Sequence, residues 1–262
     1  MDLLIDTCVF PRCRLEEADT LRKRFGKRLG FELLPMFDLP DFEENLKKNL
    51  TLFCGCPLYF HEPVWGVEHS APKGSDAYEK SMYHIRLTQK YADILHPSHM
   101  VYHLNNCIVP ASEKDEMLKT SLENLEEMHL LFPEVCLLVE NTGTRAGGNV
   151  LLDQDEFTAL CREKNFDVLI DTGHANANGW DLFRLIRDLK DRIRGYHLHN
   201  NDGTGDFHSR IDSGTLDFSR LMPFISETTP EADWVIEYID PKNSGEPLIE
   251  DTEKILRYMS GD

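Results

Sequence analysis

The chain has 262 residues, of which 41% are hydrophobic and 28% charged, and its formal net charge is −18. This is the composition of a globular protein, which excludes general disorder, and the longest wholly apolar run (135–139) is far shorter than the ~18 residues of a membrane span. The negative charge repels phosphate backbones and anionic lipids, so we expect no membrane contact and no general affinity for nucleic acid.

The N-terminus and the cysteines indicate a cytoplasmic protein. Residues 1–6 lack the basic region that precedes the apolar stretch of a secretory signal. The seven cysteines are scattered and include no Cys-x-x-Cys pair of the kind that zinc ribbons use. We therefore expect reduced thiols in a cytoplasmic protein.

Short apolar segments rich in strand-forming residues recur along the whole chain. Their mean spacing of about 33 residues is the room that one strand, one helix and two loops require. The eight segments are 3–5, 31–34, 58–60, 100–102, 137–139, 168–170, 195–198 and 234–236.

Helical patterns fill the gaps between these segments. Ser112 and Asp153 are each followed by an acidic residue three positions later, which is the pattern of a helix N-cap. After the first of them, Leu118, Leu122 and Leu125 fall on one face of a helix.

The predicted strands are apolar without alternation, as parallel strands buried on both faces are. Eight such units in about 250 residues, with no linker between them, predict an α/β protein that is a single (β/α)8 TIM barrel domain over residues 1–262. The alternative is an open doubly wound sheet. Against it, no Gly-x-Gly-x-x-Gly follows the first segment.

Residues that bind metals collect where the predicted strands end. In a (β/α)8 barrel the carboxyl ends of all strands meet at one mouth, so these side chains should converge there. Imidazole and carboxylate together suit zinc, manganese, cobalt or iron rather than magnesium. Six residues end a predicted strand and three lie shortly after one: His61, His103, Glu140, Asp171, His199 and Glu237, then His174, Asp206 and His208.

His197 is a further candidate ligand, because residues 197 and 199 point to the same side of a strand. Either can be the ligand, and we prefer His199 because it lies nearer the end of the strand. The histidines at 69, 84, 96, 99 and 129 fall in predicted helices or long loops and are interpreted as surface or structural residues.

The ordered motifs resemble the xylose isomerase-like barrel superfamily, which contains sugar isomerases and epimerases, enzymes of inositol catabolism and endonuclease IV. The resemblance covers about His61 to Glu237, and the first 50 residues match only as generic βα units. The motifs are Val139-Glu140-Asn141-Thr142-Gly143, Asp171-Thr-Gly-His174, His197-Leu-His199-Asn-Asn-Asp202-Gly, Asp206-x-His208 with Gly214-Thr-Leu-Asp217-Phe218, and Ile236-Glu237.

The resemblance implies two alternative metal centres. In the sugar-acting members it implies one divalent ion, manganese, cobalt or zinc, on the residues matching Glu140, Asp171, His199 and Glu237. In endonuclease IV it implies three zinc ions on nine ligands. All nine have a counterpart here, namely those four and His61, His103, His174, Asp206 and His208.

The favoured hypothesis is an isomerase or epimerase of a small sugar or polyol, which moves a proton next to a carbonyl through an enediolate. Such a reaction needs two carboxylates on different sides of the substrate, and Glu140 and Glu237 end strands that lie three positions apart around the ring. His174, Asp206, His208 and Arg210 would bind substrate hydroxyls or a phosphate. Alternatively, Arg210 pairs with Asp206 or Asp212.

The long loop 62–75 contains Trp65, which either closes over the substrate or packs on the rim of the barrel. We include Trp65 among the candidate substrate-binding residues.

The rival hypothesis is an endonuclease IV-like phosphodiester hydrolase. It is disfavoured because the densest basic cluster (22–24) ends the first predicted helix, on the side opposite the mouth, and the loops near the mouth are acidic or neutral. A third hypothesis is a barrel that binds a sugar or a metal without catalysis. The presence of both Glu140 and Glu237 argues against it, because binding alone needs no second carboxylate across the pocket. A homo-oligomer is compatible with all three.

Overall fold

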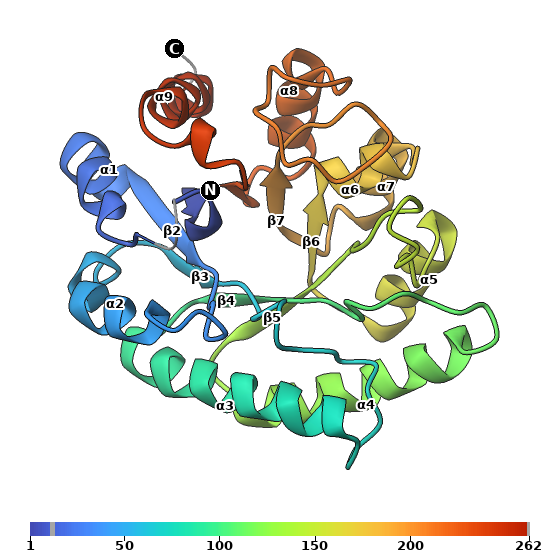
Figure 1. Cartoon of the computed structure of the whole chain (residues 1–262). Helices are drawn as coiled ribbons and strands as arrows, with labels where there is room; N and C mark the ends of the chain where they lie inside the picture. Colours follow the sequence, from blue (N-terminus) through green and yellow to red (C-terminus); the bar gives the residue numbers. More distant parts are fainter. Residues whose placement is uncertain (11–13, 261–262) are drawn as a thin grey trace.

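The computed structural model describes residues 1–10 and 14–260, and its eight strands close into a parallel barrel in which each strand pairs with the next (Figure 1). The first strand also pairs with the last, which closes the ring. This confirms the (β/α)8 fold and all eight predicted strands. They are β1 (Leu3–Asp6), β2 (Leu29–Leu33), β3 (Leu58–Phe60), β4 (His99–Tyr102), β5 (Cys136–Glu140), β6 (Val168–Asp171), β7 (Ile193–Leu198) and β8 (Asp233–Ile236).

Helices surround the barrel on its outer side (Figure 1). None of the described helices is long and apolar enough to cross a bilayer. In chain order they are α1 (Glu17–Phe25), α2 (Phe42–Asn49), α3 (Asp76–Leu95), α4 (Lys114–Leu131), α5 (Gln154–Lys164), α6 (Thr172–Ala177), α7 (Leu182–Leu189), α8 (Phe218–Thr228) and α9 (Glu246–Ser260).

One of the two predicted helix caps is confirmed. Asp153 and Glu156 form a reciprocal capping box at the start of α5. The prediction for Ser112 is wrong, because α4 begins one residue later and its N-cap residue, Glu113, makes no side-chain cap. The backbone N–H of Glu113 instead donates to the carbonyl of Pro110, so a tight turn leads into the helix.

The basic cluster of α1 lies in the last turn of that helix, where positive charge is favourable next to the helix C-terminus. Arg22 donates to the carbonyl of Cys54, Lys23 pairs with Asp19 within the helix, and Arg24 pairs with a glutamate of α9. Since α1 leads into the start of β2, this cluster lies at the end of the barrel opposite the mouth, as predicted.

Two apolar layers hold the barrel together. The larger one lies between the strands and the helices and includes Leu125 of α4, with Leu118 and Leu122 packed at its edge. The smaller one is a separate cluster of side chains that the strands point into the barrel: Leu4, Tyr59, Val101, Leu138, Leu169 and Val235.

The inner apolar cluster determines where the polar residues lie. Side chains two positions apart on a strand point to the same face. The residue two positions after each member of the cluster therefore also points into the barrel, one layer nearer the mouth. These residues are Asp6, His61, His103, Glu140, Asp171 and Glu237, so the strand alternation itself places a polar layer directly above an apolar floor.

Candidate active site

Four of the predicted ligands converge at the carboxyl ends of β5 to β8. Nε2 of His199 lies 2.9 Å from Oδ2 of Asp171 and 3.8 Å from Oε2 of Glu237. Nδ1 of His197 lies 3.2 Å from Oε2 of Glu237, and 3.6 Å from both Oε2 of Glu140 and Oδ2 of Asp171. Two ligands of one zinc ion lie at most about 4.4 Å apart, so each of these pairs is close enough to bind one ion.

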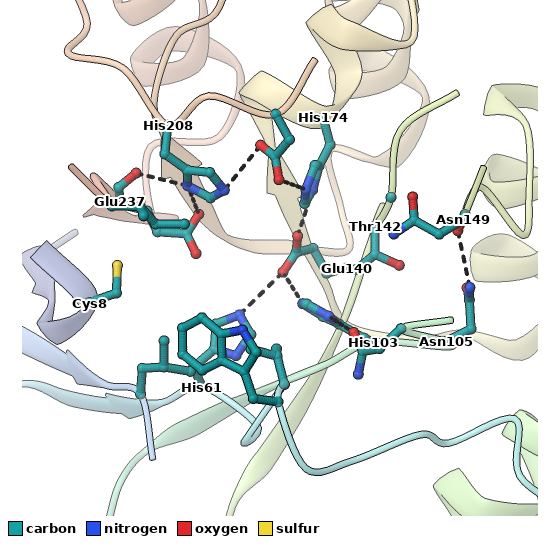
Figure 2. A pocket seen from close by; sticks show the side chains of 17 residues that line it. Cys8, His61, His103, Asn105, Glu140, Thr142, Asn149, His174, His208 and Glu237 are labelled. Carbon is teal, nitrogen blue, oxygen red and sulfur yellow. Dashed lines mark hydrogen bonds and ion pairs between the residues drawn. The ribbon is translucent and has the colours of Figure 1, made fainter. Parts of the chain in front are cut away.

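Two further ligand groups flank this centre. Glu140 lies between them in Figure 2, with His103 Nε2 3.1 Å from its Oε2 and His174 Nδ1 3.0 Å from its Oε1. On one side His61, His103 and Glu140 bring their ligand atoms within 4.8 Å of one another, and on the other side His174, Asp206 and His208 do the same. All nine predicted residues are thus brought together.

The carboxylates of the site are held ionised by the imidazoles around them. Burial alone would raise the pKa of Glu140, but His103 and His197 outweigh it and hold that pKa well below its usual range. The same competition between burial and neighbouring imidazoles holds the pKa of Glu237 well below its usual range and lowers the pKa of Asp171 to about 2.

The same interactions act in reverse on the imidazoles. Burial would lower the pKa of His174 and of His208, but the carboxylates beside them, including Asp206 for both, raise each pKa well above its usual range. The carboxylates therefore need positive charge close by, which protons supply here and a divalent cation would supply when bound.

A buried atom without a hydrogen-bond partner among the described residues also fits a cation at this centre. It is Oε2 of Glu237. An unpaired polar atom is costly to bury, and a divalent metal bound by carboxylate and imidazole would satisfy such an atom. Glu140, Asp171, His199 and Glu237 are the residues that would hold it.

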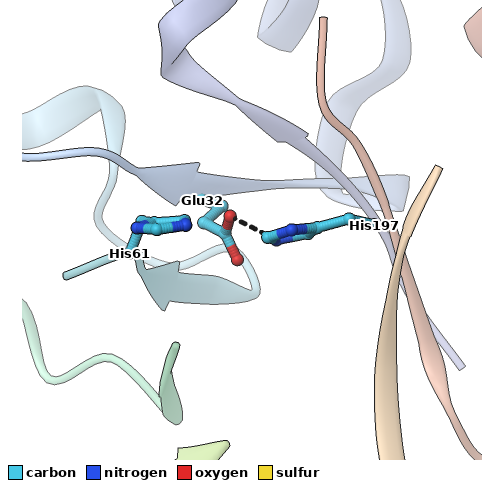
Figure 3. Close-up of side chains that lie close together, drawn as sticks. All are labelled: Glu32, His61 and His197. Atoms are coloured by element: carbon cyan, nitrogen blue, oxygen red, sulfur yellow. Dashed lines mark hydrogen bonds and ion pairs between the residues drawn. The ribbon is translucent and has the colours of Figure 1, made fainter. Parts of the chain in front are cut away.

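One nitrogen of His197 is bonded to a buried carboxylate below the site. Glu32 of β2 lies between His61 and His197 in Figure 3, and its Oε1 is 2.8 Å from Nε2 of His197. Glu32 and His197 are both fully buried. This bond fixes the ring with Nδ1 facing the carboxylates, so His197 supports the central group from one layer below His199.

Asp6 and Glu32 are members of the polar layer that the sequence reasoning missed. Burial and the charge of Glu32 raise the pKa of Asp6 well above its usual range, which favours the protonated form of Asp6. The available signal was the alternation within the first two strands, where Asp6 follows Leu4 and Glu32 follows Gly30 by two positions.

Glu62 and Asn106 were also missed, and they orient His103. The side chain of Asn106 accepts from Nδ1 of His103 at 2.7 Å and donates to Oε1 of Glu62 at 2.8 Å. The buried carboxylate of Glu62 also pairs with His69 at 2.6 Å. His69 is therefore structural, as predicted, and this network fixes the stem of the loop 62–75.

A cavity of about 320 Å³ lies over the ligand groups (Figure 2). Glu140 and Glu237 both line it, and so do His61, His103 and Trp65. The indole of Trp65 is 55% exposed, so it forms part of the rim of the cavity. The volume is that of a small-molecule site.

Arg210 does not line this cavity, which contradicts its prediction as a substrate-binding residue. Its guanidinium makes a bidentate pair with Asp251 of α9, at 2.8 and 2.9 Å, and also contacts Glu250. The alternative pairs with Asp206 or Asp212 are wrong as well, because Asp206 faces the site histidines and Asp212 pairs with Lys254.

We expect Arg210→Ala to destabilise the fold without weakening substrate binding. The change leaves the buried carboxylate of Asp251 without its cation, which costs on the order of 3 kcal/mol. The free energy of unfolding in urea measures this effect, and Lys254→Ala, which breaks an exposed pair, is the control with a cost below about 1 kcal/mol. A changed KM of Arg210→Ala with an unchanged free energy of unfolding would contradict this structural role of Arg210.

Several solved structures share the fold of this chain. A D-tagatose 3-epimerase-like protein has a TM-score of 0.77 and is 16% identical, over 99% of this chain and 97% of its own. The IOLI protein, solved with a zinc atom bound, has a TM-score of 0.75 at 14% identity, over 99% and 98%. An AP endonuclease, family 2, from Brucella melitensis has a TM-score of 0.65 at 19% identity, over 92% and 94%.

These structures show the shared fold, and a comparison with curated proteins found no match. The family model described as "Xylose isomerase-like TIM barrel" matches residues 14–259, nearly the whole chain. The chain therefore belongs to the xylose isomerase-like TIM barrel family.

Proposed function

We propose that this protein is a divalent-metal-dependent epimerase or isomerase of a small sugar or polyol, which transfers a proton at a carbon next to a carbonyl. One observation carries the proposal. Glu140 and Glu237 end strands that lie three positions apart around the barrel, and yet both carboxylates lie within 3.6 Å of Nδ1 of His197 and line one cavity.

The two carboxylates can act on a substrate from different sides. Glu140 enters the cavity from β5 and Glu237 from β8, so one accepts the proton from the substrate carbon and the other returns a proton that it takes from a neighbouring imidazolium. His174, Asp206 and His208 lie close enough to bind substrate hydroxyls. Trp65, at the rim, covers the substrate.

A metal ion would be held by Glu140, Asp171, His199 and Glu237, and manganese, cobalt and zinc suit this donor set. When bound, it supplies Lewis-acid stabilisation of the negative charge that develops on the substrate oxygens. The similarity to a D-tagatose 3-epimerase-like protein and to a zinc-bound structure supports this proposal.

A second candidate function is metal-dependent hydrolysis of a phosphodiester, as in endonuclease IV. The observation in its favour is the pair of flanking ligand groups, which would let the nine residues hold three ions. Against it are the net charge of −18 and the position of the basic cluster at the far end of the barrel, both of which disfavour a polyanionic duplex.

The number of metal ions per chain separates the two candidates. We expect about one ion, manganese or cobalt, per chain for the epimerase, whereas the hydrolase requires about three zinc ions. Elemental analysis of the purified protein measures the ratio. His61→Ala, which removes a ligand of a flanking group but no hydrogen bond to Glu140, should leave the ratio unchanged under the first proposal and reduce it under the second.

The reaction itself is tested with small ketoses in deuterated water. The proposal requires deuterium to enter the carbon next to the carbonyl, which NMR of the sugar detects, and requires a chelator to stop it. Cleavage of an abasic DNA duplex that a chelator abolishes, with no exchange into any ketose, would reverse the order of the two candidates.

A further inference from the structure

Exposed apolar side chains gather at the end of the barrel that holds the candidate site. Among the described residues, nine large apolar side chains are exposed, and five of them lie in loops that follow strands. Because all strands are parallel, these loops share one end of the barrel. Exposed apolar groups concentrated around a pocket mark a binding surface. The five are Leu39, Trp65, Ile108, Phe207 and Ile239.

One part of this rim is a defined cleft of about 250 Å³, between the loops that follow β2 and β3. Met36, Phe37, Leu39 and Pro63 line it, and its polar lining residues are Asp38 and His84. Trp65 lines both this cleft and the cavity over the ligand groups, so the two spaces are neighbours on either side of one indole ring.

Packing beneath the cleft holds it in shape. The ring of Phe37 packs edge-on against Phe42 at 5.4 Å and stacks on Tyr91 at 5.9 Å between centroids. At the other wall a Cβ on Gly66 would lie 2.4 Å from the imidazole of His84, so only glycine lets the loop approach this close. The cleft is therefore a preformed apolar space.

We propose that this cleft binds an apolar group of the substrate, the size of one aromatic ring or a branched alkyl chain, while the polyol part of the same molecule lies in the cavity beside it. The inference rests on the proposed function and narrows its substrate class to polyols that carry an apolar substituent. The cleft is smaller than the roughly 300–1,000 Å³ of sites for whole ligands, which fits a substituent better than a separate molecule.

The binding test uses the protein labelled with fluorotryptophan at its three tryptophans. Trp65 is exposed whereas Trp234 is fully buried, and Trp65→Phe identifies its fluorine resonance. Benzyl alcohol, as the minimal probe, should shift the Trp65 signal saturably and leave the Trp234 signal unchanged. Phenyl β-D-glucopyranoside should bind about tenfold more tightly than the methyl glycoside, since the ring buries apolar area.

Matched variants test the location. Leu39→Asp places a charge in the cleft and should remove the preference for the phenyl glycoside, whereas Ile108→Asp, equally on the rim but outside the cleft, should keep it. Equal affinity for the two glycosides, or equal losses in the two variants, would overturn the proposal. A fluorine resonance of Trp65 that shifts with protein concentration would instead show that a second copy of the chain occupies the cleft. That result would also overturn the proposal.

Benzyl alcohol binding is measured again after treatment with EDTA. The cleft contains none of the ligand groups, so the affinity for this probe should persist without metal. If benzyl alcohol binds but no ketose exchanges its hydrogen, the proposed function alone is contradicted. If a ketose exchanges its hydrogen but benzyl alcohol does not bind, the proposed role of the cleft alone is contradicted.

Discussion

Replacing Glu237 by glutamine is expected to slow the exchange of the substrate's carbon-bound hydrogen with solvent by about 10² to 10⁴, the contribution of a positioned general acid or base. Glutamine keeps a carbonyl oxygen for the metal and nearly the same shape, but it cannot accept or return a proton. NMR of a ketose in deuterated water measures the rate.

Two controls separate this effect from damage to the fold or the metal centre. Elemental analysis of Glu237→Gln should give the metal content of the parent protein, and its unfolding in urea should remain cooperative. Glu250→Gln changes an exposed glutamate of α9 and should leave the exchange rate unchanged. An exchange rate in Glu237→Gln equal to that of the parent would remove Glu237 from the acid/base pair.

Gly173→Ala should weaken metal binding by about 10- to 100-fold, the effect of displacing the support of a ligand. A Cβ at this position would lie 2.0 Å from Cε1 of His199. The imidazole has little room to move away, because it is fully buried and its ring stacks on His208 at 3.9 Å. Competition with a chromogenic chelator measures the affinity.

The double variant Gly173→Ala/His199→Ala tests the cause of this loss. If the added methyl group acts only by displacing His199, the double variant should bind metal as His199→Ala alone does. Gly195→Ala is the matched control inside the barrel, since a Cβ there would make ordinary contacts at 3.5 Å. Additive losses in the double variant would show that Gly173 acts through another contact.

The positions of the nine candidate ligands followed from the sequence because they depend on local features. Strand alternation fixes which side chains point inward, and the polarity of a parallel barrel fixes which ends share the mouth. His61, Glu140 and Glu237 each come two positions after an inward apolar residue. The same alternation contained Asp6 and Glu32, which were missed because the second predicted segment continued past Glu32 to residue 34.

The partners of charged side chains followed no such rule. Arg210 has acidic residues close in sequence, at 206 and 212, but it pairs with Asp251, 41 positions away, because α9 packs against its loop. The Ser112 cap failed for a related reason, since the turn that begins at Pro110 already determines how the chain enters α4.

The sequence by itself therefore determined the barrel, the mouth and the set of candidate ligands, because each is encoded by periodicity and by the residues that end each strand or follow it. Only the tertiary structure decided that Arg210 supports α9, that Glu32 and Asn106 orient His197 and His103, and that an apolar cleft lies beside Trp65. These features arise where loops and side chains far apart in the chain meet, and no local pattern specifies that contact.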